Sequence, residues 1–64
     1  MNNKPTRTIR AIDVWPGMII DSVKHRGRVA DVRQWGDEIE LMFYDNLNGI
    51  CWNKDATINI VREF

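Results

Sequence analysis

The chain has 64 residues, with nine Lys+Arg against nine Asp+Glu, 44% hydrophobic residues, and three Trp, two Phe and one Tyr. This length holds one domain, residues 1–64, and leaves no room for separate cofactor and substrate domains. The hydrophobic and aromatic content excludes a disordered chain.

The N-terminal residues and the longest apolar runs indicate the cellular compartment in which we expect this protein. We expect residues 1–5 to form a flexible N-terminal tail. We expect no signal peptide, because no apolar segment follows the first charges. No apolar run approaches the roughly 20 residues that a membrane span needs. We therefore expect a cytoplasmic protein with no membrane partner.

Alternating and β-branched residues predict strands along nearly the whole chain. The expected strands cover residues 6–12, 18–23, 28–34, 38–44, 50–53 and 57–61. Pro16-Gly17 ends the first strand, and the polar residues 24–27 form the next turn. In the third strand Val29 and Val32 are three positions apart rather than two, which predicts a bulge or bend between them, near Ala30-Asp31.

The clearest strand signal lies in residues 38–44, where apolar residues alternate with polar and mixed ones. Asn48-Gly49 is expected to supply the positive-φ positions of a turn over residues 45–49. The only Cys, Cys51, lies in an apolar run and is expected to pack as a small hydrophobe in a reducing compartment. A single 3₁₀ turn around residues 54–56 is the only helix expected.

Five or six short antiparallel strands separated by frequent turns predict an all-β sandwich or barrel. At this length closure into a small barrel is favoured, because it removes exposed sheet edges. The expected core consists of Val14, Ile20, Val29, Val32, Ile39, Leu41, Phe43, Trp52, Ile58 and Ile60.

Two runs carry a resemblance to a known fold family: Val14-Trp15-Pro16-Gly17-Met18-Ile19-Ile20 and Gly27-Arg28-Val29-Ala30-Asp31-Val32. Followed by an acidic turn and a long strand, they resemble an SH3-like barrel of the KOW and Tudor type over residues 12–62. Such modules bind RNA, DNA, methylated tails or other proteins, so the resemblance implies a fold and leaves the ligand open. The chain's size and the absence of a cofactor motif also resemble a short phage or mobile-element accessory protein.

The residue inventory argues against an enzyme. One His and one distant Cys give no zinc-ligand spacing, and the four isolated glycines form no phosphate-binding loop. Asp21, Ser22 and His25 have the residue types of a nucleophilic triad, but Ser22 and His25 are expected at opposite ends of a short strand and turn. We expect no catalytic residue, no cofactor and no metal site.

Two kinds of contact surface remain open. The first is an exposed apolar patch for a protein partner or a second copy of the chain, formed by Trp35, Met42 and Tyr44. These side chains could instead cap the open end of the barrel.

The alternative is a nucleic-acid surface, which would use the basic residues of the first half: Arg7, Arg10, Lys24, Arg26, Arg28 and Arg33. Residues 1–35 carry seven bases and three acids, a charge of +4, and residues 36–64 carry two bases and six acids, a charge of −4. This asymmetry could mark a binding surface, or the paired strands of the two halves could neutralise each other across a sheet. Zero net charge and a pI near 6.5 weigh against nucleic-acid binding, because a nucleic-acid surface is usually strongly basic. Arg28 and Arg33 are five positions apart and could share a face only if the bulge forms.

Overall fold

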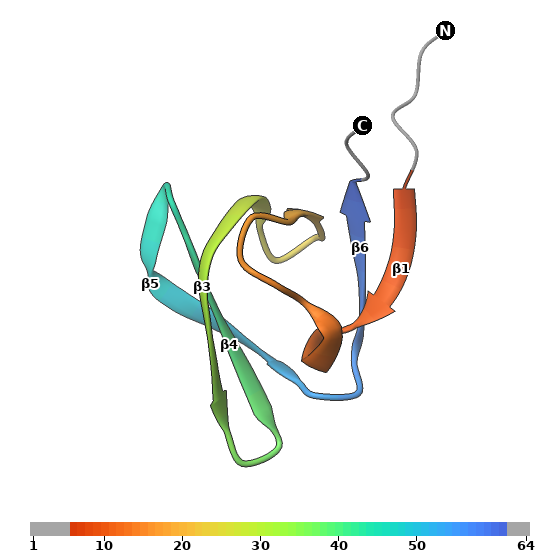
Figure 1. Ribbon diagram of the computed structural model, residues 1–64, viewed down its shortest axis with the longest axis vertical. Coiled ribbons are helices and arrows are strands. Elements are labelled where there is room, and N and C mark those ends of the chain that lie inside the picture. Colours follow the sequence, from red (N-terminus) through yellow and green to blue (C-terminus); the bar gives the residue numbers. More distant parts are fainter. Residues whose placement is uncertain (1–5, 62–64) are drawn as a thin grey trace, which may run out of the picture.

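Antiparallel strands make up most of residues 6–61, the part of the chain that this computed structural model describes (Figure 1). The elements are β1 (Thr6–Arg10), η1 (Ala11–Asp13, a 3₁₀ turn), β2 (Ile19–Asp21), β3 (Arg26–Trp35), β4 (Glu38–Phe43), β5 (Asn46–Asn53) and β6 (Thr57–Val61). These six strands confirm the predicted small all-β domain. The expected tail, residues 1–5, lies outside the described residues.

The strands form one antiparallel sheet in the order β1-β6-β2-β3-β4-β5. The first part of β3 pairs with β2 and the second part with β4, so this long strand joins the two halves of the sheet. The register between β3 and β4 shifts between Val29 and Asp31, which confirms the predicted bulge. Because of the extra residue, Val29 and Val32 both lie opposite core-facing positions of β4, Phe43 and Leu41.

The core lies between the two halves of the bent sheet. Its buried residues are Ala11, Val14, Ile20, Val29, Ile39, Leu41, Phe43, Trp52, Ile58 and Ile60. Nine of these were expected from the sequence. The exceptions are Val32, which is only partly buried, and Ala11, which lies in the predicted strand over residues 6–12 but was not among the expected core residues.

The position of Ala11 follows from where β1 ends. The predicted strand over residues 6–12 stops at Arg10, and the chain turns inward as η1. The Ala11 N–H donates to the Ala56 carbonyl (2.8 Å) and the Ile12 N–H to the Lys54 carbonyl (3.0 Å), which ties η1 to the β5–β6 turn. The 3₁₀ turn therefore forms at residues 11–13 and not at 54–56.

Two expectations about β5 are wrong. The connection after β4 consists only of Tyr44-Asp45, so Asn48 and Gly49 lie inside β5, and of the two only Gly49 has a positive φ, 79°. The register of β4 and β5 shifts between Leu41 and Phe43, and this irregularity accommodates the positive φ within the strand.

The second error concerns Cys51, which is exposed and not packed in the core. Cys51 lies opposite Glu40, whereas Trp52 lies opposite the buried Ile39. Successive side chains of a strand point to opposite faces, so an inward Trp52 requires an outward Cys51.

Candidate protein-binding surfaces

The structure does not gather Trp35, Met42 and Tyr44 into one patch. Trp35 pairs with Glu38 at the start of β4, while Met42 lies four positions further along that strand, about 13 Å away at the usual rise per residue. Glu40 lies between them and accepts a hydrogen bond from Trp35 Nε1 (3.0 Å). Tyr44 is exposed beyond the opposite end of β4.

The two arginines of β1 point to opposite faces of the sheet. Arg7 lies opposite Ile60, which faces the core, and Arg10 lies opposite Thr57 on the outer face. Arg10 contacts two carboxylates, those of Asp13 (3.4 Å) and Asp55 (3.8 Å). The β1 arginines therefore do not form one basic surface.

The bulge does bring Arg28 and Arg33 to the same, outer side of β3, because each alternates with a valine that faces the core. They lie on different halves of the bent strand, however. Arg28 Nη1 donates to the Gly17 carbonyl (2.7 Å), and Arg33 pairs with Asp31 (3.6 Å). Both guanidinium groups thus have contacts within the protein.

The remaining basic candidates also have partners. Arg26 Nε lies 2.8 Å from Asp21 Oδ1. Lys24 Nζ donates to the Cys51 carbonyl (2.7 Å) and lies 5.0 Å from the centre of the Trp52 ring. These contacts compete with phosphate groups for the same cations.

Ser22 and His25 do not form a nucleophile and base pair. Ser22 Oγ donates to the His25 carbonyl and accepts from the backbone N–H groups of Lys24 and His25, so it stabilises the β2–β3 turn. Asp45 Oδ1 accepts a hydrogen bond from His25 Nε2 (3.0 Å), and the imidazole packs on the Phe43 ring with centroids 4.3 Å apart. The histidine therefore links the β2–β3 and β4–β5 turns.

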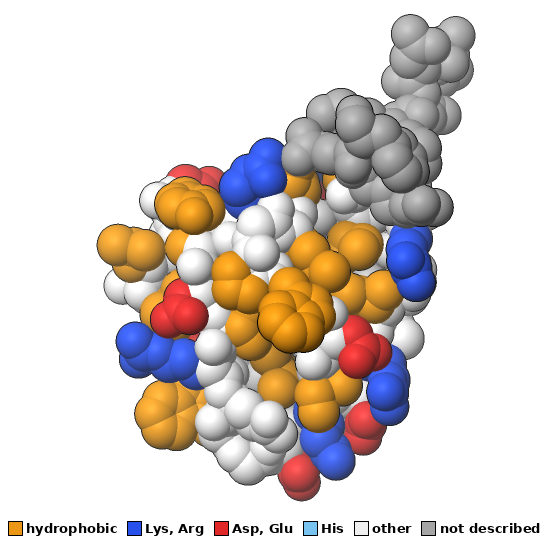
Figure 2. All heavy atoms as spheres, in the orientation of Figure 1, with side chains coloured by type: hydrophobic (Ala, Val, Ile, Leu, Met, Phe, Trp, Pro, Cys, Tyr) orange, Lys and Arg blue, Asp and Glu red, His pale blue; other side chains and the backbone are white. Residues whose placement is uncertain are grey.

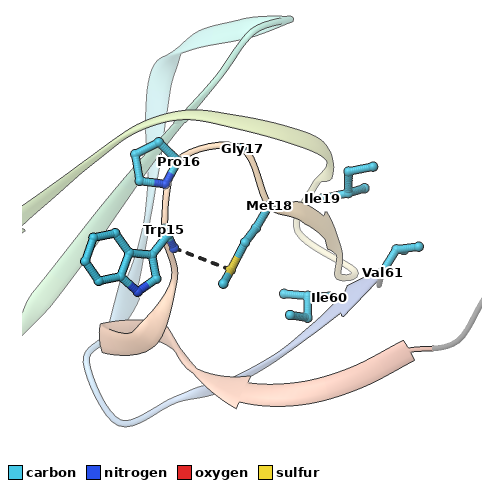
Figure 3. Close-up of a pocket in the computed structure, with 7 residues that line it drawn as sticks. All are labelled: Trp15, Pro16, Gly17, Met18, Ile19, Ile60 and Val61. Atoms are coloured by element: carbon cyan, nitrogen blue, oxygen red, sulfur yellow. Dashed lines mark hydrogen bonds between the residues drawn. The ribbon is translucent and has the colours of Figure 1, made fainter. Parts of the chain in front are cut away.

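An apolar groove that was not predicted opens beside the loop between η1 and β2. Its volume is about 540 Å³, and its lining residues are Trp15, Pro16, Gly17, Met18, Ile19, Ile60 and Val61. We call it the Trp15 groove. Figure 3 shows the Met18 side chain lying between Trp15 and Ile60. Figure 2 shows hydrophobic side chains gathered across the middle of the face that carries this loop, with charged side chains at its margins.

Backbone hydrogen bonds fix the loop that forms the groove. The Gly17 N–H donates to the Val29 carbonyl and the Val29 N–H donates to the Met18 carbonyl, both at 2.8 Å. The Trp15 N–H points at Met18 Sδ (3.4 Å; Figure 3). The Trp15 side chain nevertheless stays 70% exposed. A tryptophan immediately before a Pro-Gly turn is the sequence signal that could have located this site, because such a turn holds the side chain outside the strand alternation.

Within residues 6–61, no group of three or more His, Cys, Asp and Glu side chains could hold a metal ion. In the same range, none of the helical structure is long and apolar enough to cross a membrane. No protein-family model matches the chain, and comparisons with curated proteins and with solved structures found no match.

Proposed function

We propose that this chain is a non-enzymatic protein-binding module whose Trp15 groove accepts an apolar segment of its partner. One observation carries the proposal: a tryptophan that is 70% exposed stands at the rim of an apolar hollow, on a loop fixed by backbone hydrogen bonds. A rigid loop presents the ring without a large entropy cost on binding.

The composition of the groove supports an apolar ligand. None of its seven lining residues is charged. Met18 adapts to irregular shapes because its side chain is unbranched, and Trp is enriched among the residues that dominate binding energy. Covering the exposed part of one Trp removes on the order of 100–170 Å² from water, worth about 3–4 kcal/mol before association costs.

We also propose that the fold is the SH3-like barrel of the KOW and Tudor type. The consecutive antiparallel order of β2, β3, β4 and β5, with β6 returning between β1 and β2, supports this assignment. The bulge in β3 supports it too, because bulges let a long strand take part in two halves of a barrel.

Selection of peptides from a random display library on the wild-type protein tests the proposed function. We expect the selected peptides to be rich in aromatic and aliphatic residues. Trp15→Ala should weaken their binding by at least tenfold in fluorescence titration. The matched control is Trp35→Ala, which removes a tryptophan that is 60% exposed but lies outside the groove, and it should change the affinity less than twofold.

Equal loss of affinity in both variants, or failure to select any peptide, would contradict the proposal. A second titration distinguishes the nucleic-acid alternative. The labelled ligand is a 20-nucleotide single strand. If it binds at micromolar protein and the affinity falls steeply as salt rises, the function would be nucleic-acid binding through Arg28 and Arg33 and not protein binding. We expect no such binding.

A further inference from the structure

The Asn48-Gly49 pair lies in an irregular part of β5. Here residues 47–49 stand between two ladder pairs and face the single residue Met42 of β4. The extra residues of such a bulge have no ladder partner, so their peptide groups are held less firmly than those of a regular strand. This matters for the chemistry of the pair, because asparagine is one of the thermolabile residues.

The four asparagines within residues 6–61 differ in how their side chains are held. In three of them the side-chain oxygen accepts a hydrogen bond: Asn46 from the Asn48 N–H (3.2 Å), Asn53 from the Asp55 N–H (3.0 Å) and Asn59 from Thr8 Oγ1 (2.7 Å). The exposed carboxamide of Asn48 makes no hydrogen bond with any described residue. Asn48 is therefore the one of these four whose side chain can turn toward its own backbone at no cost in hydrogen bonds.

The residue that follows Asn48 sets it apart as well. Asn46, Asn53 and Asn59 precede Leu47, Lys54 and Ile60, whereas Asn48 precedes a glycine with a φ of 79°. A side chain on the following residue hinders the approach of an asparagine carboxamide to the next backbone nitrogen, and glycine has none. At Asn48 a free carboxamide, an irregular backbone and an unhindered neighbour thus occur together.

We propose that Asn48 is a site of spontaneous deamidation, in which the Gly49 backbone nitrogen attacks the Asn48 side chain. A bond forms between this nitrogen and Asn48 Cγ, the Cγ–Nδ2 bond breaks, and the proton of the Gly49 nitrogen leaves with Nδ2 as ammonia. Water then opens the cyclic imide at either of its two carbonyl carbons. Opening at Cγ gives aspartate, and opening at the main-chain carbon gives isoaspartate, in which Cβ becomes part of the main chain.

The conversion changes the charge beside Glu40. A Cβ on Gly49 would lie 2.9 Å from Glu40 Cδ, and Trp35 Nε1 donates to Glu40 Oε1 (3.0 Å), which holds this carboxylate beside the bulge. Either product adds a second carboxylate one residue away and changes the net charge from zero to −1. Repulsion between the two carboxylates should destabilise the folded chain. None of these residues lines the Trp15 groove, so the proposal does not rest on the proposed function.

Long incubation of the folded wild-type chain in warm, mildly alkaline buffer tests the proposal. Peptide mass spectrometry should show replacement of the amide NH₂ by a hydroxyl at Asn48 at least ten times faster than at Asn46, Asn53 or Asn59. A synthetic peptide with the sequence of residues 44–52 measures the same chemistry without the fold, and the folded chain should convert Asn48 within tenfold of the peptide's rate. Both aspartate and isoaspartate should form, because the imide opens at two carbons.

Asn48→Gln is the matched control, because a glutamine would have to close a larger ring. This variant should show no conversion at position 48, and circular dichroism confirms that it is folded. Ion exchange separates converted wild-type chains by their added negative charge, and their unfolding midpoint in urea should be lower than that of fresh protein.

Three results would overturn the proposal. The first is conversion of Asn48 more than tenfold slower in the folded chain than in the peptide, which would mean that the strand holds the pair too firmly. The second is conversion of Asn46, Asn53 or Asn59 as fast as Asn48. The third is formation of aspartate alone, which indicates direct hydrolysis of the side chain without the imide. An unchanged urea midpoint would refute the effect inferred at Glu40.

Discussion

Replacing Leu41 by alanine tests the packing on which the fold depends. Leu41 is 0% exposed and lies in β4, between Val32 on β3 and Ile50 on β5. Strands hydrogen-bonded on both sides of β4 prevent the backbone from moving into the space that the smaller side chain leaves. We therefore expect a cost in the upper part of the range for Leu→Ala changes, about 3–5 kcal/mol.

That cost is large compared with the stability of so short a chain. At about 0.05–0.15 kcal/mol per residue, 64 residues give a free energy of unfolding of roughly 3–10 kcal/mol. With a urea dependence of about 1 kcal/mol per molar at this size, the unfolding midpoint should fall by about 3 M or more. If the wild-type free energy of unfolding lies at the lower end of that range, Leu41→Ala leaves a large fraction of the protein unfolded in buffer.

Urea titration monitored by circular dichroism and tryptophan fluorescence measures this loss, since Trp52 is buried and reports on the core. Leu47→Ala is the matched control, because it makes the same chemical change at an exposed position and should cost less than about 0.5 kcal/mol. Both variants are measured at a concentration where the chain is monomeric. A loss below 1 kcal/mol for Leu41→Ala, or equal losses in the two variants, would refute the packing argument.

Two further changes test local features by the same urea titration. Gly49→Ala should destabilise the protein by about 2–3 kcal/mol, because φ is 79° and the new Cβ would lie 2.9 Å from carbons of the Glu40 side chain. Gly17→Ala is the control: φ is 97° and the space around Gly17 is open, so the change should cost only about 1 kcal/mol of backbone strain. Equal costs would show that Glu40 moves away freely. Arg26→Ala should lower the free energy of unfolding by less than about 1 kcal/mol, because the Arg26 side chain is 81% exposed in its ion pair with Asp21. In 1 M salt the loss should be smaller still, since salt screens the pair. A larger loss would mean that this ion pair has a structural role.

Contact surfaces were harder to predict than the core. Trp35, Met42 and Tyr44 looked like one patch because Met42 and Tyr44 alternate on one strand and Trp35 comes just before it. Distance along the strand and the hydrogen bond from Trp35 to Glu40 separate them. The Trp15 groove needs Ile60 and Val61 of β6 beside the loop that contains Trp15 and the start of β2, and β6 lies more than 40 positions later in the sequence. No local pattern reports such a juxtaposition.

The sequence by itself determined the elements whose signal is local. Alternation of apolar residues located β4 and all of β6, and the valine spacing in β3 located the bulge, because side chains of a strand face opposite sides in turn. The tertiary structure decided what depends on distant partners. Ala11 is buried because its N–H meets the Ala56 carbonyl, and Cys51 is exposed because the neighbouring Trp52 fills the core. In both cases a contact across the fold outweighs the local preference of the residue.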